Sequence, residues 1–394
     1  MTGSQLRDDA GGDGSRADAA GSGAPSGAGG SGPRGHVAVV VRASGIHPRT
    51  SRLVALGILA YGPDGIVEDE WHSTFTVGED PGPAHLHGLT PEDLEGSPRF
   101  GTKLAEIAEF VADRDVVTHN LPMNWGFVIE EARRARRQAG RAGRNRRGRG
   151  RRPRSGPMPA PATVTDTLAT TRRQGMRPDD RRLFGVARAY GIPAPSPVAS
   201  TDNIGVPERE RTMLEADVLR RLHLEQLARA AADPALAGTI ATWAASDLRS
   251  DSHGLQRSSI RVDAMNAPRP LPNPGVYERG GRLEEGMEFA LAPEVLVPAD
   301  ELIAAGVAAG LAYSEKVTRE TSVLVCNQPA DVTPDQLHGK AMHAHRKGIP
   351  LVSDEAFLRL AGRLRDRVAA RAAAEEEGSG GSGGSGGPSE RAKA

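Results

Sequence analysis

The strongest chemical signal in the sequence is a run of arginines. Twelve of the 22 positions from residue 133 to residue 154 are arginine, interrupted by Gly, Asn and Pro. Guanidinium groups pair well with phosphate, so the run favours contact with single-stranded DNA or RNA. No aromatic residue lies between Phe127 and Phe184, which excludes base stacking within the run and leaves phosphate contact. The candidate contacts are Arg141, Arg144, Arg146, Arg147, Arg149, Arg151 and Arg152.

Like charges at this density repel one another, and the run offers no apolar face to bury. We therefore expect a disordered, solvated insert at residues 138–160, between a helix and the next strand. The alternative is a low-complexity loop that only keeps the chain in solution.

Carboxylates form a second chemical group, at the start of a helix predicted over residues 208–231. They could bind Mg²⁺, although a solvated helix face explains the three glutamates better. The four side chains are Glu208, Glu210, Glu215 and Asp217. A third group, His338, His343 and His345, has no cysteine partner, so we expect these imidazoles to be solvated.

Composition limits the classes of protein to consider. Fifty basic residues balance fifty acidic ones, so the whole chain gives no electrostatic argument for a polyanionic partner. No apolar run reaches the length of a spanning helix, and no signal pattern opens the chain, so we expect a cytoplasmic protein without a membrane partner. The single cysteine, Cys326, excludes a disulfide within the chain.

The elements that must position these groups begin near residue 36. Apolar runs at residues 37–41, 52–61 and 71–77, separated by Gly and Pro turns, predict an antiparallel three-stranded meander. Later elements are a short strand at 116–118, a resumption of the fold at 163–168, and helices at 100–113, 127–137, 181–190 and 208–231. Together they predict a mixed sheet flanked by helices.

A second, smaller pattern alternates strands with helices and predicts a parallel sheet. Its strands are 287–291, 312–313, 323–325 and 349–352, and its helices are 299–309, 340–347 and 355–364. The resulting organisation is a disordered leader at 1–34, a first domain at 35–232, a linker at 233–285, a second domain at 286–366 and a disordered tail at 375–394.

Short segments spread over residues 36–230 carry a family resemblance. They are the strand 37–41 with its turn at 45–48, His87-Gly88-Leu89-Thr90 followed by Phe100, Val117-Thr118-His119-Asn120 with Phe127, Thr165-Asp166-Thr167-Leu168, and Gly191-Ile192-Pro193. Together they resemble the DEDDh 3′→5′ exonucleases, which include the proofreading epsilon subunit of bacterial DNA polymerase III. The resemblance implies a ribonuclease H-like exonuclease fold and places His119 and Asn120 near a bound strand.

The same comparison puts unexpected residue types at the catalytic positions. The Asp and Glu of the family's first motif fall on Val40 and Arg42, and the Asp of the second falls on Asn124. The His and Asp of the third motif fall on Thr212 and Asp217. In the family, four carboxylates hold two Mg²⁺ ions and the histidine accepts a proton from water.

No histidine occurs between His119 and His223, so no shift of register restores the family's base. Arg42 would also repel a divalent ion beside it. We therefore expect a metal-free relic of the nuclease site, in which Arg42 either contacts phosphate, or points to solvent or pairs with Asp217.

Segments over about 80 residues of the second pattern resemble a BRCT domain. They are 286–291, 308–312, 317–325, 339–341 and 348–357. Many BRCT domains bind phosphate through a hydroxyl, a Gly N–H and a Lys. Here Ala292 and Pro293 replace the first two, so Lys340 alone remains of the phosphate pocket.

The sequence therefore predicts an exonuclease-like α/β domain followed by a small BRCT-type α/β domain. The predicted function is a nucleic-acid-associated binding or scaffold protein of replication or repair, without a cofactor, that takes a protein partner through its second domain. One alternative is an active exonuclease that uses Mg²⁺ or Mn²⁺. Another is a protein-interaction platform with no role in nucleic-acid binding.

Overall fold

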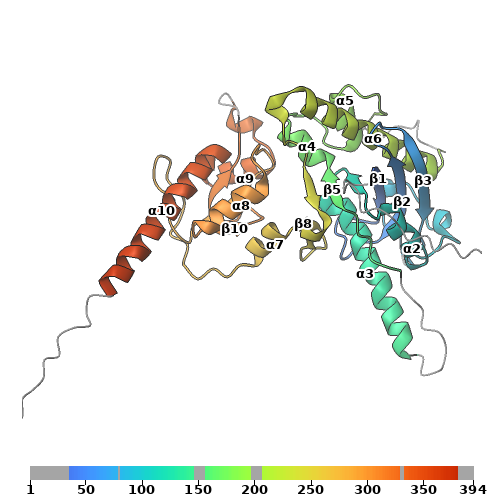
Figure 1. Cartoon of the computed structure of the whole chain (residues 1–394), viewed down its shortest axis with the longest axis horizontal. Coiled ribbons are helices and arrows are strands. Elements are labelled where there is room, and N and C mark those ends of the chain that lie inside the picture. The colour runs from blue at the N-terminus through green and yellow to red at the C-terminus, as the bar shows by residue number, and fades with distance from the viewer. Residues whose placement is uncertain (1–34, 79, 146–155, 197–205, 329–331, 380–394) are drawn as a thin grey trace, which may run out of the picture. The chain divides into compact units, whose positions relative to one another are not determined.

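The computed structural model describes residues 35–78, 80–145, 156–196, 206–328 and 332–379, which belong to one compact unit, residues 33–394. Figure 1 shows this unit and labels many of its elements. The first sheet contains β1 (His36–Ala43), β2 (Leu53–Tyr61), β3 (Val67–Thr74), β4 (Asp115–Thr118), β5 (Thr163–Asp166) and β6 (Thr242–Ala244). The helices of this part are α1 (Ala84–His87), α2 (Phe100–Val111), α3 (Leu121–Asn145), α4 (Thr167–Arg173), α5 (Leu183–Ala189) and α6 (Glu208–Ala232).

The first sheet has six strands in the order β3-β2-β1-β4-β5-β6. The predicted meander is confirmed, because β1, β2 and β3 pair antiparallel, whereas β4 and β5 continue the sheet parallel to β1. β1 lies in the middle with both faces covered, which is why its sequence is a continuous apolar run rather than an alternating one. The expected mixed sheet flanked by helices is therefore present.

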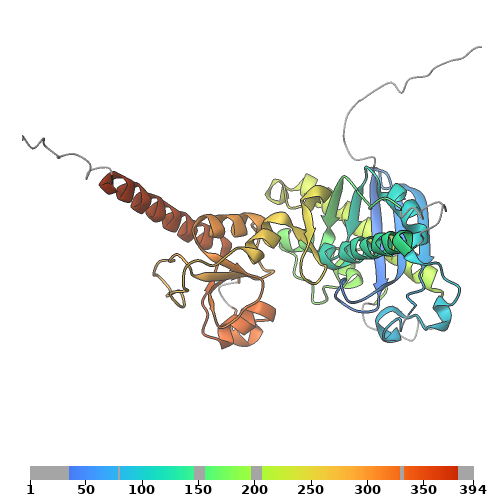
Figure 2. The ribbon, with the colours of Figure 1, turned by 90° about the horizontal axis from the view of Figure 1, so that it is seen from below.

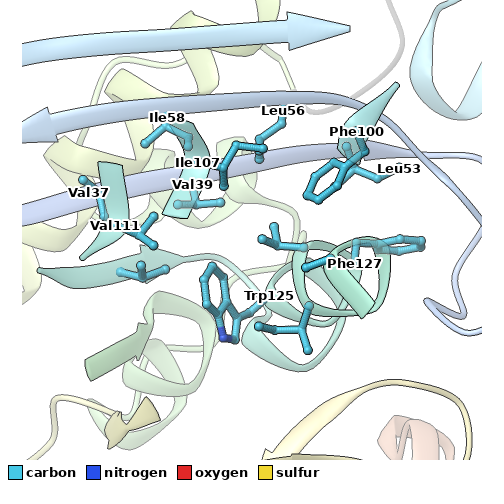
Figure 3. Packing of buried hydrophobic residues seen from close by; sticks show 14 of the residues in the cluster. Val37, Val39, Leu53, Leu56, Ile58, Phe100, Ile107, Val111, Trp125 and Phe127 are labelled. Carbon is cyan, nitrogen blue, oxygen red and sulfur yellow. The ribbon is translucent and has the colours of Figure 1, made fainter. Parts of the chain in front are cut away.

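Alternate residues of β1 serve two apolar layers. Val37 and Val39 pack with residues of α2 and α3, and Figure 3 shows Trp125 and Phe127 of α3 in this layer. Ala38 and Val40 point the other way and pack against α6. In Figure 2, α3 is seen lying across the strands of the sheet. The two layers hold the carboxyl end of β1 against the start of α6.

Helix α3 is longer than its sequence predicts. It extends to Asn145, although we expected the helix to end at residue 137 and a disordered insert to begin at 138. Glu130 pairs with Arg133 at 2.6 Å and Glu131 with Arg134 at 2.8 Å within the part predicted as helix. Beyond it, four of the eight residues 138–145 are alanine or arginine, which have high helix propensity. The prediction is wrong for residues 138–145, and residues 146–155 lie outside the described part.

Residues 233–285, predicted as a linker, contain β6, β7 (Leu248–Ser250), β8 (Gln256–Ser258) and α7 (Ser259–Asn266). β6 pairs antiparallel with β5 and so completes the edge of the first sheet, while β7 and β8 form a hairpin. A strand of three residues is too short to show alternation, which is why sequence periodicity misses it. The linker prediction is therefore wrong for β6.

The second sheet has four parallel strands in the order β10-β9-β11-β12, as its alternating pattern predicts. The elements are β9 (Glu288–Leu291), α8 (Ala299–Ala308), β10 (Ala312–Ser314), β11 (Thr321–Val325), α9 (Gly339–Arg346), β12 (Leu351–Val352) and α10 (Asp354–Ser379). Phe289 packs towards α8 and α10 on one face, and Ala290 towards α9 on the other. α10 continues through residues 375–379, so the prediction of a disordered tail from residue 375 is wrong for these five residues.

The longest helices, α3, α6 and α10, are rich in charged side chains. Across the described ranges, no helix combines the length and the apolar character that crossing a membrane requires.

Gly57 of β2 lies directly against Thr212 of α6. A Cβ built at Gly57 would lie 2.5 Å from Cγ2 of Thr212, so Gly57→Ala should lower the free energy of unfolding by about 1–3 kcal/mol. Thr212→Ser removes that methyl group but keeps the hydroxyl, so the double variant should regain most of the loss. Chemical denaturation measures both. Gly140→Ala on α3 is the control, because a Cβ there meets nothing within 4 Å. Strictly additive costs would contradict this packing.

Candidate functional site

The carboxyl ends of β1, β4 and β5 lie side by side, because these three neighbouring strands run parallel. Arg42 stands at the end of β1, His119 and Asn120 follow β4, and Asp166 ends β5. Helix α6 covers the same face of the sheet as Arg42, since Val40, two residues earlier, packs on Ala216. We call this region the strand-end site.

Arg42 is held by α6 at the strand-end site. Its Nη2 donates to Glu215 at 2.9 Å and its Nε donates to the Thr212 hydroxyl at 3.2 Å. Glu208 lies 3.9 Å from Nε and also accepts from His72, at 2.5 Å. The guanidinium is thus neutralised within the protein, by Glu215 rather than by Asp217.

The α6 carboxylates separate into two kinds. Glu208 and Glu215 turn inward, with side chains 8% and 22% exposed, so the solvated face that we considered for them is wrong. Glu210 is exposed as that alternative requires. Although burial raises the pKa of Glu208, hydrogen bonds from His72 and Thr212 and the charge of Arg42 hold it below its usual value. Glu208 is therefore an anion at neutral pH.

Asp217 does not face Arg42. It bonds to Arg220 at 2.6 Å and to Arg221 at 2.7 Å, one turn further along α6. The preceding residue, Ala216, is the one that is fully buried against β1. A helix turns by about 100° per residue, so Asp217, two positions beyond Glu215, lies about 200° around the helix and faces away from the site.

The residues after β4 are bound to their neighbours. Asn124 donates its amide to the backbone carbonyl of His119. The His119 ring meets the Thr167 hydroxyl through Nδ1, at 2.9 Å, and the Arg181 carbonyl through Nε2, at 2.8 Å. Because a carbonyl only accepts, Nε2 carries the proton and Nδ1 accepts. Burial lowers the pKa of His119, which favours the neutral ring. Both ring nitrogens are then occupied by hydrogen bonds within the protein.

Asp166 is the last residue of β5, so its carboxylate lies at the strand-end site. Both of its oxygens already accept hydrogen bonds from the backbone. They accept from the backbone N–H groups of Asn120 and Leu121, and from those of Leu168 and Ala169 at the start of α4. Asn120 adopts a left-handed backbone, φ 67°, which Asn tolerates better than most residues. Asp166 thus has a structural role, as a cap for α4 and an anchor for the start of α3.

The arginines of α3 differ in availability. Arg133 and Arg134 are paired with glutamates, whereas Arg136, Arg137 and Arg141 are exposed and have no ion-pair partner among the described residues. Arg144 lies within α3. The remaining predicted contacts, Arg146, Arg147, Arg149, Arg151 and Arg152, lie outside the described part of the chain.

Lys340 lies in the first turn of α9, and its side chain reaches back to the end of β9. It donates to the Leu291 carbonyl at 2.8 Å and lies 3.7 Å from Glu315. Glu315 also accepts two hydrogen bonds from Arg261, both at 2.9 Å, and lies 3.7 Å from Arg257. Although burial raises the pKa of Glu315, the charges of Arg261, Lys340 and Arg257 lower it to about 2. A carboxylate of the protein itself therefore satisfies Lys340.

One cavity of about 460 Å³ is lined by two residues singled out from the sequence. They are Asn120, predicted to lie near a bound strand, and Lys340, predicted as the remnant of a phosphate pocket. Basic side chains outnumber acidic ones around it, since Arg172, Arg173, Arg257, Arg261 and Lys340 face Asp166, Asp300 and Glu315. Nε of Arg172 is buried and has no partner within the described residues. The excess of basic side chains makes the electrostatics of this cavity favour an anion over a cation.

Sequence reasoning missed Glu208 and Glu215 as partners of Arg42, and Glu315 as the partner of Lys340. Each pair joins separate segments of the chain, and Arg42 and Glu215 are 173 positions apart. The sequence does contain one signal for such a partner: a basic residue in a buried strand needs a counter-charge from another element.

No family model matches the chain, and neither does any curated protein. Several solved structures of exonuclease I are similar to it. One, described as suggesting how processivity is achieved, is 14% identical with a TM-score of 0.35, over 51% of this chain and 42% of that chain. Exonuclease I from E. coli, in complex with a dT13 oligonucleotide, is 16% identical with a TM-score of 0.33, over 49% of this chain and 40% of that one.

A third, exonuclease I from Methylocaldum szegediense, is 18% identical with a TM-score of 0.33, over 51% of this chain and 41% of that chain. The chain thus matches about two fifths of the length of these exonuclease I structures. At these identities and TM-scores the likeness assigns no role to any residue of this chain.

The Glu315 cluster gives a stability prediction. Glu315→Gln leaves Arg261, Arg257 and Lys340 without their shared anion, so the free energy of unfolding at pH 7 should fall by about 3 kcal/mol. The folded-state pKa of about 2 lies below the ordinary 4.5, so this stabilisation is complete above pH 4.5 and is lost as pH falls towards 2.

Denaturation of both proteins across this pH range should therefore show their difference shrink below pH 4.5. The exposed Glu320→Gln is the control and should match the wild type throughout. An equal loss in both variants, or a difference that does not change with pH, would contradict the assigned charge cluster.

Proposed function

We propose that this chain binds nucleic acid without cleaving it. Its first part is an exonuclease-like domain whose strand-end site does not hold two Mg²⁺ ions. The single observation that carries the proposal is the ion pair of Arg42 with Glu215, at the end of β1. An arginine there takes the space and the counter-charges that a metal would need.

The electrostatics support this proposal. A guanidinium about 4 Å from a divalent cation repels it by roughly 8 kcal/mol, at an effective dielectric constant of about 20. Glu208 and Glu215 offset part of that repulsion, but their oxygens already bind His72, Thr212 and Arg42. Mg²⁺ needs free oxygen ligands in octahedral geometry, and this network leaves few.

The surface that we assign to nucleic acid is the exposed arginine face of α3, which consists of Arg136, Arg137 and Arg141. These side chains are free to meet phosphates, whereas Arg42 is neutralised and His119 and Asn124 are bonded internally. We expect contacts to the backbone of a single strand of DNA or RNA, without sequence preference.

For the second part we propose a BRCT-type interaction domain that docks a protein partner. The parallel sheet with α8 and α10 on one face and α9 on the other supports this assignment. Because Glu315 and the Leu291 carbonyl engage Lys340, we do not assign phosphopeptide binding to it. A role in replication or repair would follow from the two domains together.

One observation favours a second candidate function, an exonuclease with an unusual set of ligands. Glu208 and Glu215 both face the strand-end site, and two inward carboxylates are the minimum from which a metal site could be built. This alternative requires Arg42 to leave both of them when a metal binds.

A nuclease assay separates the two candidates. Labelled single-stranded DNA incubated with the full chain and Mg²⁺ or Mn²⁺ should remain uncut, because the part of the chain that the structure describes positions no free group of carboxylates to activate water. The paired variant Glu208→Gln/Glu215→Gln is the control. Robust cleavage by the wild type that this variant abolishes would establish the unusual exonuclease and overturn our proposal.

Salt dependence tests the binding surface. Replacing Arg136, Arg137 and Arg141 by Ala should weaken binding of single-stranded DNA and lower the slope of log K against log salt by about 2, because each lost phosphate contact contributes about 0.7. Deletion of residues 146–155 should weaken binding further. The matched control replaces Arg359, Arg363 and Arg365, three exposed arginines of α10. Equal affinity and slope in all four proteins would exclude this surface.

A further inference from the structure

A row of polar residues crosses the first sheet at the end opposite to Arg42. His36 at the start of β1 is in register with Tyr61 of β2 and with Asp115 of β4, and Asp115 is in register with Thr163 of β5. His36 shares the face of β1 that packs against α6, because it alternates with Ala38 and Val40. α6 brings His223 to this row.

Two imidazoles and a carboxylate meet there. One donor atom from each of His36, Asp115 and His223 lies within 4.8 Å of the other two. His223 and Asp115 are almost completely buried, whereas the His36 side chain is 18% exposed and separates the group from solvent. Among the described residues, this is the one group of three such side chains close enough to share an ion.

Each buried member is oriented by a neighbour. The Tyr61 hydroxyl meets Nδ1 of His223 at 2.8 Å. The carboxylate of Asp115 accepts from the hydroxyls of Thr163, at 2.7 Å, and Thr165, at 3.0 Å, and meets Nδ1 of His36 at 3.2 Å. Hydrogen bonds that fix the ring plane of a histidine and the oxygens of a carboxylate are the support that metal ligands receive in proteins.

We propose that His36, Asp115 and His223 form a binding site for a single Zn²⁺ ion, with a water molecule as the fourth ligand. Imidazole and carboxylate donors suit Zn²⁺, whereas Mg²⁺ prefers oxygen ligands alone. Tetrahedral Zn²⁺ with bonds near 2.1 Å separates its ligand atoms by roughly 3.4 Å. The donors, at most 4.8 Å apart, therefore need to close by no more than roughly 1.4 Å.

This site is separate from the strand-end site. Arg42 lies six residues beyond His36 on β1, roughly 20 Å away along an extended strand. On α6, His223 lies eight residues beyond Glu215, roughly 12 Å along the helix. An ion here would tie β1, β4 and α6 together and would not reach a substrate in the strand-end site, so we assign it a stabilising role.

Calorimetry on the chelator-treated full chain tests the site. Zn²⁺ should bind with a stoichiometry of one ion per chain and raise the melting temperature, because it binds the folded state. Co²⁺ in its place should give the intense visible bands of tetrahedral coordination. His36→Ala should abolish these bands and lower the affinity for Zn²⁺ at least about tenfold, and Tyr61→Phe should lower that affinity about 10–100-fold with the ligands retained.

The control is His343→Ala/His345→Ala, which removes two exposed histidines of α9 and should leave both signals unchanged. Circular dichroism establishes that each variant is folded before titration. The proposal is overturned if Co²⁺ gives no tetrahedral bands with the wild type. It is also overturned if folded His36→Ala and Tyr61→Phe proteins bind Zn²⁺ as the wild type does, or if the α9 variant loses the ion.

Discussion

A charged residue on a strand that is covered on both faces must find a counter-charge inside the protein. Arg42 is that residue, because β1 lies between the layer of α2 and α3 and the layer of α6. Glu215 and Glu208 supply the counter-charge, and the Thr212 hydroxyl completes the contact. The same interaction holds the start of α6 on the sheet and occupies the strand-end site.

Helix α6 connects two polar clusters through an apolar middle. Its first turns serve Arg42, Ala216 and Leu219 pack on the sheet, and His223 reaches the row that contains Asp115. The two clusters have opposite chemistry. Near Arg42, a cation of the protein neutralises carboxylates, whereas near His223 two imidazoles and one carboxylate have no such cation among them. One helix thus carries both the carboxylates that pair with Arg42 and the imidazole of the cluster for which we propose Zn²⁺.

The second part repeats the arrangement seen at Arg42. Lys340 is satisfied by the Leu291 carbonyl and by Glu315, which Arg261 also binds through two hydrogen bonds. Arg42 in the first part and Lys340 in the second are thus both paired with a carboxylate of the folded chain. The exposed arginines of α3 are different, because they project from a helix beyond the sheet, and for this reason they form the surface that we assign to phosphate.

The periodicity of the sequence by itself determined the meander, the mixed sheet and the small parallel sheet, since alternation and helical spacing follow from backbone geometry. It located Arg42 and Lys340 as unusual residues, but not the full length of α3, the three-residue strand β6 or the inward turn of Glu215. Only the tertiary structure decided those, and only it joined His36, Asp115 and His223. Strand register and the rotation of α6 select such partners, and both depend on packing between segments far apart in the chain.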